Sequence, residues 1–379
     1  MSALTKQRTR SLGEIISDSI ARHEKQGRVV QSMTSRERVL TAAERRLADR
    51  TPADYKAEPA VNEYMMEFLK VATYEELLQR LEIDVRRLEP RYVGRPYQTF
   101  EDGVFEDYWG IRSKRLAAGR GVYDMHVHTP LWDAQTVEDL EKHAWPTPDI
   151  FDYSVMREQC ARYRGYAVMY EGADLFTRPG ILRNMENLLV DMIERPEMAH
   201  FLFRKFTDFY SEDIARALEA ASGGFDIYCE WSDYGTQRAL LMSIPMFREF
   251  VAPYLKRLID LCHSAGVKFM AHSCGAIRPL IPDLVALGVD ILDPIQVAAE
   301  GMEPAGLKRD FGDKLAFHGG ICTQRTLPFG TTHDVRQAVL DRVETLGAGG
   351  GYIIASSHDI SADTPEENIV AMYDVELRR

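Results

Sequence analysis

The stretch His272-Ser273-Cys274-Gly275 carries two side chains that could bind a metal ion. It follows an apolar run over residues 266–271, which predicts a buried strand. Residues two apart at the end of a strand point the same way, so the imidazole and the thiol leave the sheet together. These groups are preferred ligands of Zn²⁺, and two of them form half of a tetrahedral site. An isolated His-x-Cys also occurs as a buried Cys beside a hydrogen-bonded His, so the surrounding segments must decide.

Other predicted strands also end in polar groups. From about residue 165, strands expected over 166–170, 225–229, 267–271, 289–292, 315–317 and 351–355 alternate with helices. This alternation indicates parallel pairing, and at least six such units fit an α/β fold of the (β/α)₈ TIM-barrel type. Active sites of such barrels lie where the strands end. The tips here are residues 230–235, 272–275, 293–296, 318–322 and 356–359, which hold two Cys and three His.

The first part of the chain has a different pattern. Helix starts are expected at 10–14 and 34–37, and a helix is expected over 74–88. We therefore expect a helical N-terminal extension over residues 1–120, packed on a barrel over residues 121–379.

Composition limits the class of protein. The chain has 379 residues, of which 45% are hydrophobic and 27% charged, as in soluble globular proteins. The net charge of −12 argues against nucleic acid as a partner. No apolar run suggests a membrane span or a signal peptide, so a cytoplasmic location is expected. Five widely spaced Cys do not indicate a disulfide framework.

The strand tips, in this order, resemble those of the uroporphyrinogen decarboxylase superfamily, which includes the decarboxylase and the zinc- and corrinoid-dependent methyltransferases. The resemblance covers roughly residues 120–379. It rests on residues 130–131 with 137–140, 245–253 (PMFREFVAP), 272–275 (HSCG), 288–296 (GVDILDPIQ), 318–320 (HGG) and 363–369 (DTPEENI).

Two departures favour the methyltransferase branch. The Arg-rich N-terminal signature with which the decarboxylase grips its substrate carboxylates is absent. The methyltransferase branch has His-x-Cys at the position of His272 and Cys274, and a later Cys where this chain has His358. The resemblance therefore implies zinc bound by His272, Cys274 and His358, with Cys322 as the alternative third ligand.

The resemblance also implies a partner. The methyltransferases move a methyl group between a small molecule and a corrinoid, and this chain has no corrinoid-binding motif of the DxHxxG type. The corrinoid must then arrive on a separate protein. A site with one thiolate is a stronger Lewis acid than a site with two, which favours demethylation of a methyl ether over activation of a thiol. A homodimer is a further expectation.

Other polar residues near the tips are assigned roles as hypotheses. Asp233 and Glu230 could be catalytic proton carriers, or Asp233 could support or join the metal ligands; helix capping is the simpler alternative. Residues expected to contact substrate are Tyr234, Gln296, His318, His126 and His128.

Two alternative functions remain open. The superfamily resemblance also allows a decarboxylase-like lyase. The run Asp124-Met125-His126-Val127-His128 resembles the HxH strand of metal-dependent hydrolases, although the later ligands of those enzymes find no counterpart here.

Overall fold

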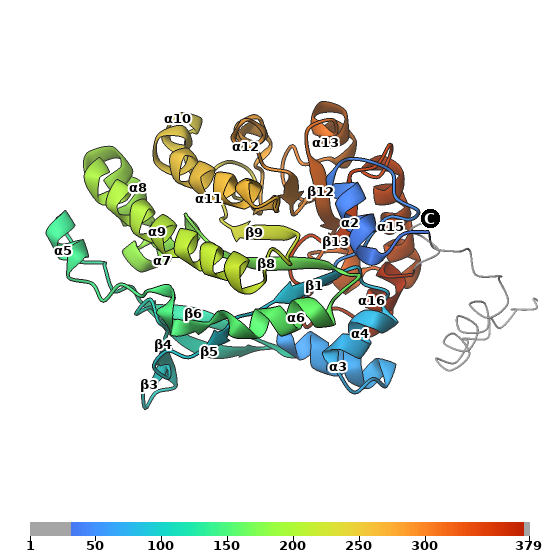
Figure 1. Ribbon diagram of the computed structural model, residues 1–379, viewed down its shortest axis with the longest axis horizontal. Coiled ribbons are helices and arrows are strands. Elements are labelled where there is room, and N and C mark those ends of the chain that lie inside the picture. Colours follow the sequence, from blue (N-terminus) through green and yellow to red (C-terminus); the bar gives the residue numbers. More distant parts are fainter. Residues whose placement is uncertain (1–31, 375–379) are drawn as a thin grey trace, which may run out of the picture.

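Seven parallel strands form the main sheet of the protein. The computed structural model describes residues 32–374 (Figure 1). The order of the strands follows the chain: β1 (Val85–Leu88), β8 (Ala167–Ala173), β9 (Ile227–Trp231), β10 (Lys268–His272), β11 (Ile291–Asp293), β12 (Ala316–Ile321) and β13 (Tyr352–Ser356). Each neighbouring pair is parallel.

An irregular segment around Ala53 closes this sheet into a barrel. Ala53 forms a parallel bridge with Ile354 of β13. The amide of Asp54 donates to the carbonyl of Ile354 at 2.8 Å, and the amide of Asp84, just before β1, donates to the carbonyl of Ala53 at 2.9 Å. The segment therefore occupies the eighth strand position, and the predicted (β/α)₈ fold is confirmed.

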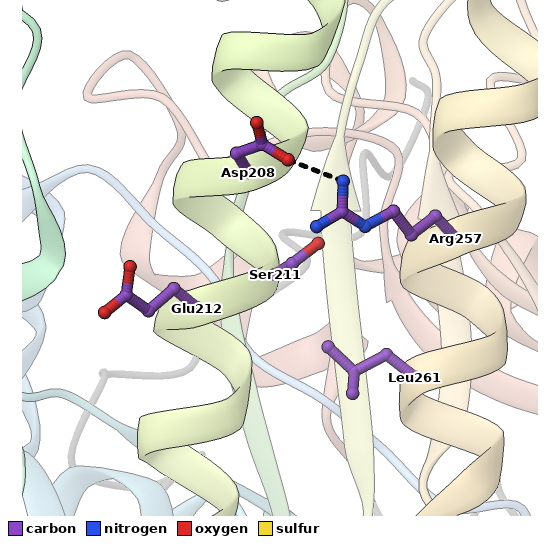
Figure 2. A pocket seen from close by; sticks show the side chains of 5 residues that line it. All are labelled: Asp208, Ser211, Glu212, Arg257 and Leu261. Atoms are coloured by element: carbon purple, nitrogen blue, oxygen red, sulfur yellow. Dashed lines mark hydrogen bonds and ion pairs between the residues drawn. The ribbon is translucent and has the colours of Figure 1, made fainter.

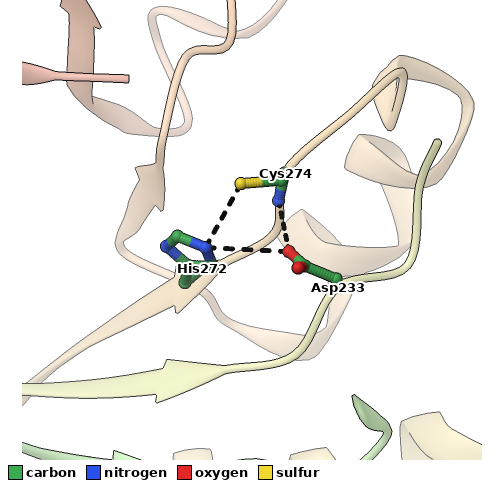
Figure 3. Close-up of side chains that lie close together, drawn as sticks. All are labelled: Asp233, His272 and Cys274. Atoms are coloured by element: carbon green, nitrogen blue, oxygen red, sulfur yellow. Dashed lines mark hydrogen bonds and ion pairs between the residues drawn. The ribbon is translucent and has the colours of Figure 1, made fainter. Parts of the chain in front are cut away.

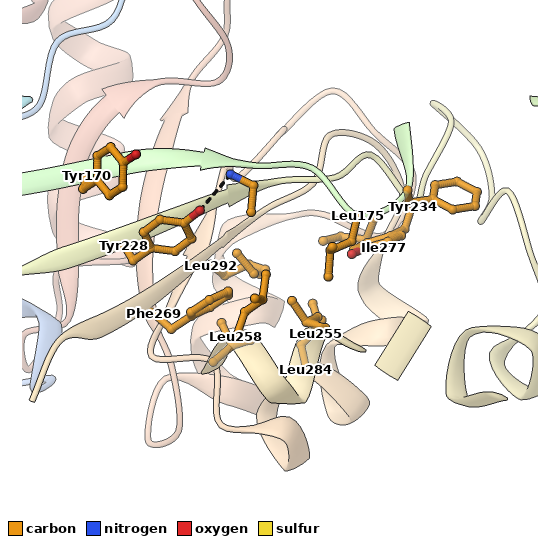
Figure 4. Close-up of a cluster of buried hydrophobic side chains, with 14 of the residues drawn as sticks. Tyr170, Leu175, Tyr228, Tyr234, Leu255, Leu258, Phe269, Ile277, Leu284 and Leu292 are labelled. Carbon is orange, nitrogen blue, oxygen red and sulfur yellow. Dashed lines mark hydrogen bonds between the residues drawn. The ribbon is translucent and has the colours of Figure 1, made fainter. Parts of the chain in front are cut away.

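Helices cover the outside of the barrel between successive strands. They are α3 (Pro59–Leu69), α4 (Tyr74–Arg80), α6 (Met156–Arg162), α7 (Thr177–Arg183), α8 (Met185–Glu194), α9 (Pro196–Ala220), α10 (Ile244–Met246), α11 (Ala252–Ser264), α12 (Ile281–Leu287), α13 (Pro304–Phe311), α14 (Thr326–Phe329), α15 (Thr332–Thr345) and α16 (Glu366–Met372). Outward-facing side chains such as Tyr228 and Phe269 pack with Leu255 and Leu258 of α11 in the main core (Figure 4).

A second apolar cluster fills the interior of the barrel. It takes alternate residues from the strands, including Met169, Cys229, Met270 and Ile291. Helix α2 (Ser35–Ala43) contributes Val39, Ala42 and Ala43 to it. The predicted start of α2 is confirmed, because Thr34 and Glu37 form a reciprocal capping box. The other predicted helix start, at residues 10–14, lies outside the described residues.

An antiparallel sheet is inserted between β1 and β8. Its strands are β3 (Gln98–Thr99), β4 (Val104–Glu106), β5 (Arg112–Ala118) and β6 (Gly121–His128), and β6 is an edge. Short elements flank it: β2 (Arg91–Tyr92), β7 (Phe151–Asp152), α5 (Val137–Glu141), and 3-10 turns at Pro148–Ile150 and Tyr153–Val155. Across residues 32–374, no helix combines the length and apolar character that crossing a membrane requires.

The helix expected over 74–88 was wrong in its second half. Helix α4 ends at Arg80, and Glu82 adopts a left-handed conformation with φ 51°. Strand β1 follows, because pairing with β8 buries Val85 and Leu88. Residues before 120 thus supply a barrel strand and much of the antiparallel sheet, in addition to the expected helices.

Candidate metal centre

Asp233, His272 and Cys274 come together at the carboxyl ends of β9 and β10 (Figure 3). One ligand atom from each lies within 4.8 Å of the others. Nε2 of His272 is 3.5 Å from Sγ of Cys274 and 3.6 Å from Oδ1 of Asp233. Two ligands of a tetrahedral zinc, each about 2.0–2.3 Å from the metal, lie about 3.3–3.8 Å apart. The two distances from Nε2 therefore match the edges of a tetrahedral site.

The ring of His272 is held from its other side. Asp293, its register partner on β11, accepts a hydrogen bond from Nδ1 at 2.6 Å. This contact leaves the Nε2 lone pair free for a metal, as in many histidine sites whose second nitrogen bonds a carboxylate. Trp231 packs against the same imidazole at 4.4 Å between ring centroids, and the Lys56 ammonium lies 3.0 Å above the indole.

Asp293 also binds a second histidine. Its Oδ1 lies 2.5 Å from Nδ1 of His318, and Nε2 of His318 lies 3.1 Å from Asp54. Asp54 in turn accepts two hydrogen bonds from Arg87 of β1 at 2.9 and 2.7 Å. Because carboxylates face both of its nitrogens, His318 is a doubly hydrogen-bonded imidazolium.

The pKa values of this network follow from its charges. Burial alone would lower the pKa of His318, but Asp293 and Asp54 outweigh it and raise the pKa to about 9. Burial would likewise raise the pKa of Asp293, yet His318 and His272 hold it well below its usual range. At neutral pH the chain Arg87, Asp54, His318, Asp293 therefore alternates in charge.

Cys274 is unsuited to act as a free thiolate. Burial raises the pKa of its thiol well above the usual range, and the carboxylates of Asp233 and Asp293 add to the effect. A thiolate at this place needs a neighbouring cation, and a metal ion on the same three donors would supply it.

The loop after Cys274 is fixed by a close approach of two backbones. Gly275 has φ +93°, and a Cβ there would lie 2.5 Å from the carbonyl oxygen of Thr236. The Gly275 amide donates to Oε1 of Gln296 at 2.5 Å. The amide of Cys274 donates to Asp233 at 2.7 Å. Gln296, expected to contact substrate, thus fixes this loop.

Glu230 lies outside the group formed by Asp233, His272 and Cys274, called the metal group below. It alternates with Trp231 along β9, so the two side chains point to opposite faces of the sheet. Glu230 is fully buried and accepts hydrogen bonds from the Ser232 hydroxyl and the Leu175 amide. Burial raises its pKa to about 8, so it is protonated at neutral pH. A catalytic role for Glu230 stays a prediction that this placement does not favour.

The other residues predicted to bind metal or substrate at the strand tips lie outside the metal group. The ring of His358 is exposed, with its centroid 6.4 Å from that of His272. Cys322 is buried at the end of β12 and is not a member of the group. Tyr234 is buried between Phe176 and Phe247. His318, expected to contact substrate, is buried, and both of its ring nitrogens lie within hydrogen-bond distance of carboxylates. Its contact with substrate stays a prediction.

The two histidines of the HxH run lie on the exposed edge strand β6. His126 contacts Ser113 at 2.9 Å, while His128 is exposed at the end of the strand. Neither belongs to the metal group found among the described residues. The hollow between α9 and α11, lined by Asp208, Ser211, Glu212, Arg257 and Leu261, also lies apart from the strand tips (Figure 2).

Several neighbours of the candidate metal centre were not predicted from the sequence: Asp54, Lys56, Arg87, Trp231 and Asp293 as the partner of two histidines. The two-residue period of the strands could have identified three of these five residues. Arg87, Trp231, Asp293 and His318 each lie two residues after a member of the interior apolar cluster (Val85, Cys229, Ile291 and Ala316). Period two therefore places them in the next layer of the barrel interior.

The family model described as uroporphyrinogen decarboxylase (URO-D) matches residues 176–376, more than half of the chain. The chain belongs to the uroporphyrinogen decarboxylase family. Among curated relatives, uroporphyrinogen decarboxylase 2, chloroplastic, from Oryza sativa subsp. japonica is 25% identical over 52% of this chain and 47% of its own length. The uroporphyrinogen decarboxylase of Anaeromyxobacter sp. is 27% identical over 47% of each chain. This family member thus spans about half the length of the curated relatives it matches.

A solved structure resembles the whole fold of this family member. It is a methyltransferase from Methanosarcina mazei, with a TM-score of 0.64 and 17% identity, covering 90% of this chain and 97% of the other. The likeness extends over the N-terminal residues that precede the family-model match, and it confirms the barrel fold.

Replacing His318 with Gln should destabilise the protein by about 3 kcal/mol at pH 7, because two buried carboxylates lose their shared cation. The stabilisation by a histidine with a raised pKa is complete below its unfolded value of 6.5 and is lost as pH rises through about 9. Chemical denaturation should therefore show a smaller difference in unfolding free energy between wild type and His318→Gln at pH 10 than at pH 7. His333→Gln, at an exposed position of α15, is the control. If this difference in unfolding free energy were the same at both pH values, His318 would not be an imidazolium in the folded protein.

Replacing Glu230 with Gln should alter how stability varies with pH. The pKa of Glu230 is about 8 in the folded protein and 4.5 in the unfolded chain, so between these values unfolding releases a proton. The free energy of unfolding of wild type should therefore fall relative to that of Glu230→Gln as pH rises from 5 to 8, by about 1.4 kcal/mol per pH unit. Above pH 8 the two curves should run parallel. Exposed Glu367→Gln is the control. If the denaturation midpoints of wild type and Glu230→Gln differed by the same amount at every pH from 5 to 8, Glu230 would be ionised in the folded protein.

Proposed function

We propose that this protein is a zinc-dependent methyltransferase that moves a methyl group between a small molecule and a corrinoid carried by a separate protein. The observation that carries the proposal is the convergence of Asp233, His272 and Cys274. The methyltransferase named above, alike over nearly its full length, supports the same reaction class.

The donor set fits zinc in number, type and spacing. An imidazole, a thiolate and a carboxylate are all zinc ligands, and three protein ligands leave a fourth position for substrate. His358, with its ring 6.4 Å from that of His272, lies outside this group of three, and the zinc measurement below tests whether it is a ligand instead of Asp233. Zinc bound there would act as a Lewis acid on the oxygen or sulfur that bears the methyl group.

The protein's own residues give the site its orientation. Asp293 fixes the ring of His272 with Nε2 facing the other two donors. The Cys274 amide holds Asp233 at 2.7 Å, so the carboxylate stays beside the thiol. Trp231 covers the imidazole face, and Lys56 lies over the indole with 31% of its side chain exposed. These contacts preorganise the donors, which reduces the rearrangement needed when a metal or substrate binds.

The composition of the set favours a methyl ether as the methyl donor. A carboxylate is a harder ligand than a thiolate and transfers less electron density to zinc. A site with one thiolate therefore polarises an ether oxygen more strongly than a site with two. We propose that the departing oxygen is stabilised here while the reduced corrinoid accepts the methyl group.

A decarboxylase-like lyase is the second candidate, because the curated relatives bear that name. Their similarity covers about half of each relative, and the Arg-rich signature is absent from this sequence. The metal-dependent hydrolase receives no support, since His126 and His128 lie outside the metal group. A homodimer and a cytoplasmic location stay predictions; the exposed edge strand β6 is available for an interface.

Zinc content should separate ligands from neighbours. We expect about one zinc per chain, with affinity lowered at least 100-fold in His272→Ala, Cys274→Ala and Asp233→Ala. Asp293→Asn should weaken binding 10- to 100-fold, because it removes the carboxylate partner of His272. Retention should fall as pH drops, since the ligands bind deprotonated. Competition with a chromogenic chelator measures these affinities.

Two variants serve as matched controls in the zinc measurement. Cys322→Ser and His358→Ala remove a thiol and an imidazole that lie outside the group of three. Both should keep about one zinc per chain. Loss of zinc in either control, together with retention in Asp233→Ala, would assign the third ligand to that residue instead.

The reaction itself can be tested by absorbance. With zinc-loaded protein, a methyl ether and a reduced corrinoid, formation of methylcobalamin is expected at a rate that falls more than 100-fold in Cys274→Ala. Uroporphyrinogen should not be converted to coproporphyrinogen. Turnover of uroporphyrinogen that disappears in Asp233→Asn would instead establish the lyase.

A further inference from the structure

Lys56 brings a positive charge into the mouth of the barrel from the wall opposite the candidate metal centre. It lies on the extended segment that closes the barrel between β13 and β1. In this segment Ala53 and Tyr55 belong to the outer core, whereas Asp54 faces the interior, where it contacts His318. Because side chains alternate along an extended chain, Lys56 also faces the interior.

The two-residue period of the strands places Lys56 in the same layer as two members of the metal group. Trp231 and His272 lie in the layer below, as does the residue two positions before Lys56. Lys56, Asp233 and Cys274 each come two residues later on their segments. Strand β10 lies across the barrel from the closing segment. Lys56 therefore faces these two ligands across the mouth.

The contacts of the ammonium show that it crosses the mouth. Its Nζ lies 3.0 Å from the ring centroid of Trp231, and that ring packs on His272 at 4.4 Å. Within residues 32–374 its one carboxylate partner is Asp359, beyond the end of β13, at 3.6 Å. The side chain of Lys56 is 31% exposed. Both contacts are weak for a partly exposed ammonium, so they hold Lys56 in the mouth without neutralising its charge.

The charges of the metal group leave a role for this cation. As metal ligands, Cys274 and Asp233 each carry one negative charge and His272 is neutral. A divalent metal ion bound by these three residues is therefore formally neutral with its ligands. An oxygen that becomes an anion beside such a centre is stabilised by a further positive charge nearby.

We propose that Lys56 is a catalytic residue that stabilises the oxygen anion released by methyl transfer. In this step the methyl carbon accepts an electron pair from cobalt(I) of the reduced corrinoid, which becomes methylcobalt(III). The carbon–oxygen bond breaks and its electron pair stays on the oxygen. The Lys56 ammonium stabilises this anion by its charge and by an N–H donor. The inference rests on the proposed function, but binding of the anion can be measured by itself.

The test is calorimetric titration of the zinc-loaded full-length protein without any corrinoid. The probes are 4-nitrophenolate and 4-nitroanisole, which share a ring and differ in the charge on the oxygen. Lys56→Met should bind 4-nitrophenolate about tenfold or more weakly than wild type and 4-nitroanisole equally well. Lys56→Arg, which keeps the charge, should recover most of the lost affinity. Lys314→Met removes an exposed lysine just before β12 and should bind both probes like wild type.

Asp359→Asn guards against an effect of misfolding. It removes the negative charge 3.6 Å from the Lys56 ammonium, which competes with a bound anion. This variant should therefore bind 4-nitrophenolate several-fold more tightly than wild type, a gain that damage to the fold would not produce. The gain should disappear when Asp359→Asn is combined with Lys56→Met, because the two residues act as a pair.

The choice of leaving group provides a kinetic readout. With a reduced corrinoid present, Lys56→Met should lower kcat for demethylation of anisole about 100-fold and leave KM nearly unchanged. The loss with 4-nitroanisole should be much smaller, because the nitro group already spreads the negative charge of the departing oxygen. A purely structural role of Lys56 would lower both rates equally.

Two binding results would overturn the inference: unchanged affinity for 4-nitrophenolate in Lys56→Met, or an equal loss for 4-nitrophenolate and 4-nitroanisole. The outcome is separable from that of the proposed function. Anion binding that depends on Lys56, without methylcobalamin formation, would reject the reaction and keep the anion site. Demethylation of anisole at the wild-type rate in Lys56→Met would reject the role of Lys56 and keep the reaction.

Discussion

The carboxylate of Asp293 is the interaction on which the site depends, because it holds two histidines from neighbouring strands at once. One oxygen accepts Nδ1 of His272 and the other accepts Nδ1 of His318. Strands β10, β11 and β12 are adjacent in the barrel, so their register fixes this arrangement. The orientation of His272, and therefore the direction of its free Nε2, follows from the sheet and not from a flexible loop. A donor held on rigid strands keeps its geometry when the ligand changes.

The same interaction links the metal centre to the closure of the barrel. His318 contacts Asp54, and Asp54 lies in the segment that fills the eighth strand position between β13 and β1. Arg87 of β1 completes the connection through its two hydrogen bonds to Asp54. These two residues precede the part of the chain that the family model matches. The ends of the barrel wall therefore meet at a charged cluster that also supports the site.

The sequence predicts the site residues that lie on neighbouring strand tips. It does not predict those that come from segments far apart in the chain. His272 and Cys274 are two residues apart on one tip, and Asp233 lies at the end of the preceding strand, so the barrel topology is enough to bring them together. Asp54 and His318 are far apart in the chain, and no local pattern identifies the irregular segment around Ala53 as a strand equivalent. Strand β1 was not predicted because Leu78 and Leu81 are followed by Val85 and Leu88 at helical spacing, and these last two residues pair with β8.

A buried ionic layer is a weak source of stability, since removing charges from water costs several kcal/mol per ion and the attraction between them offsets little more than that. Its persistence inside this barrel calls for another explanation, and the order of charges supplies one. From Arg87 through Asp54, His318 and Asp293 the signs alternate, and His272 follows with its Nε2 facing a thiol and a carboxylate. A divalent cation at that nitrogen would continue the alternation and would favour the thiolate form of the buried Cys274. The layer thus presents Nε2 of His272, with the thiol and the carboxylate, at the end where the strands open, and a positive charge there would complement the carboxylate of Asp293 behind it.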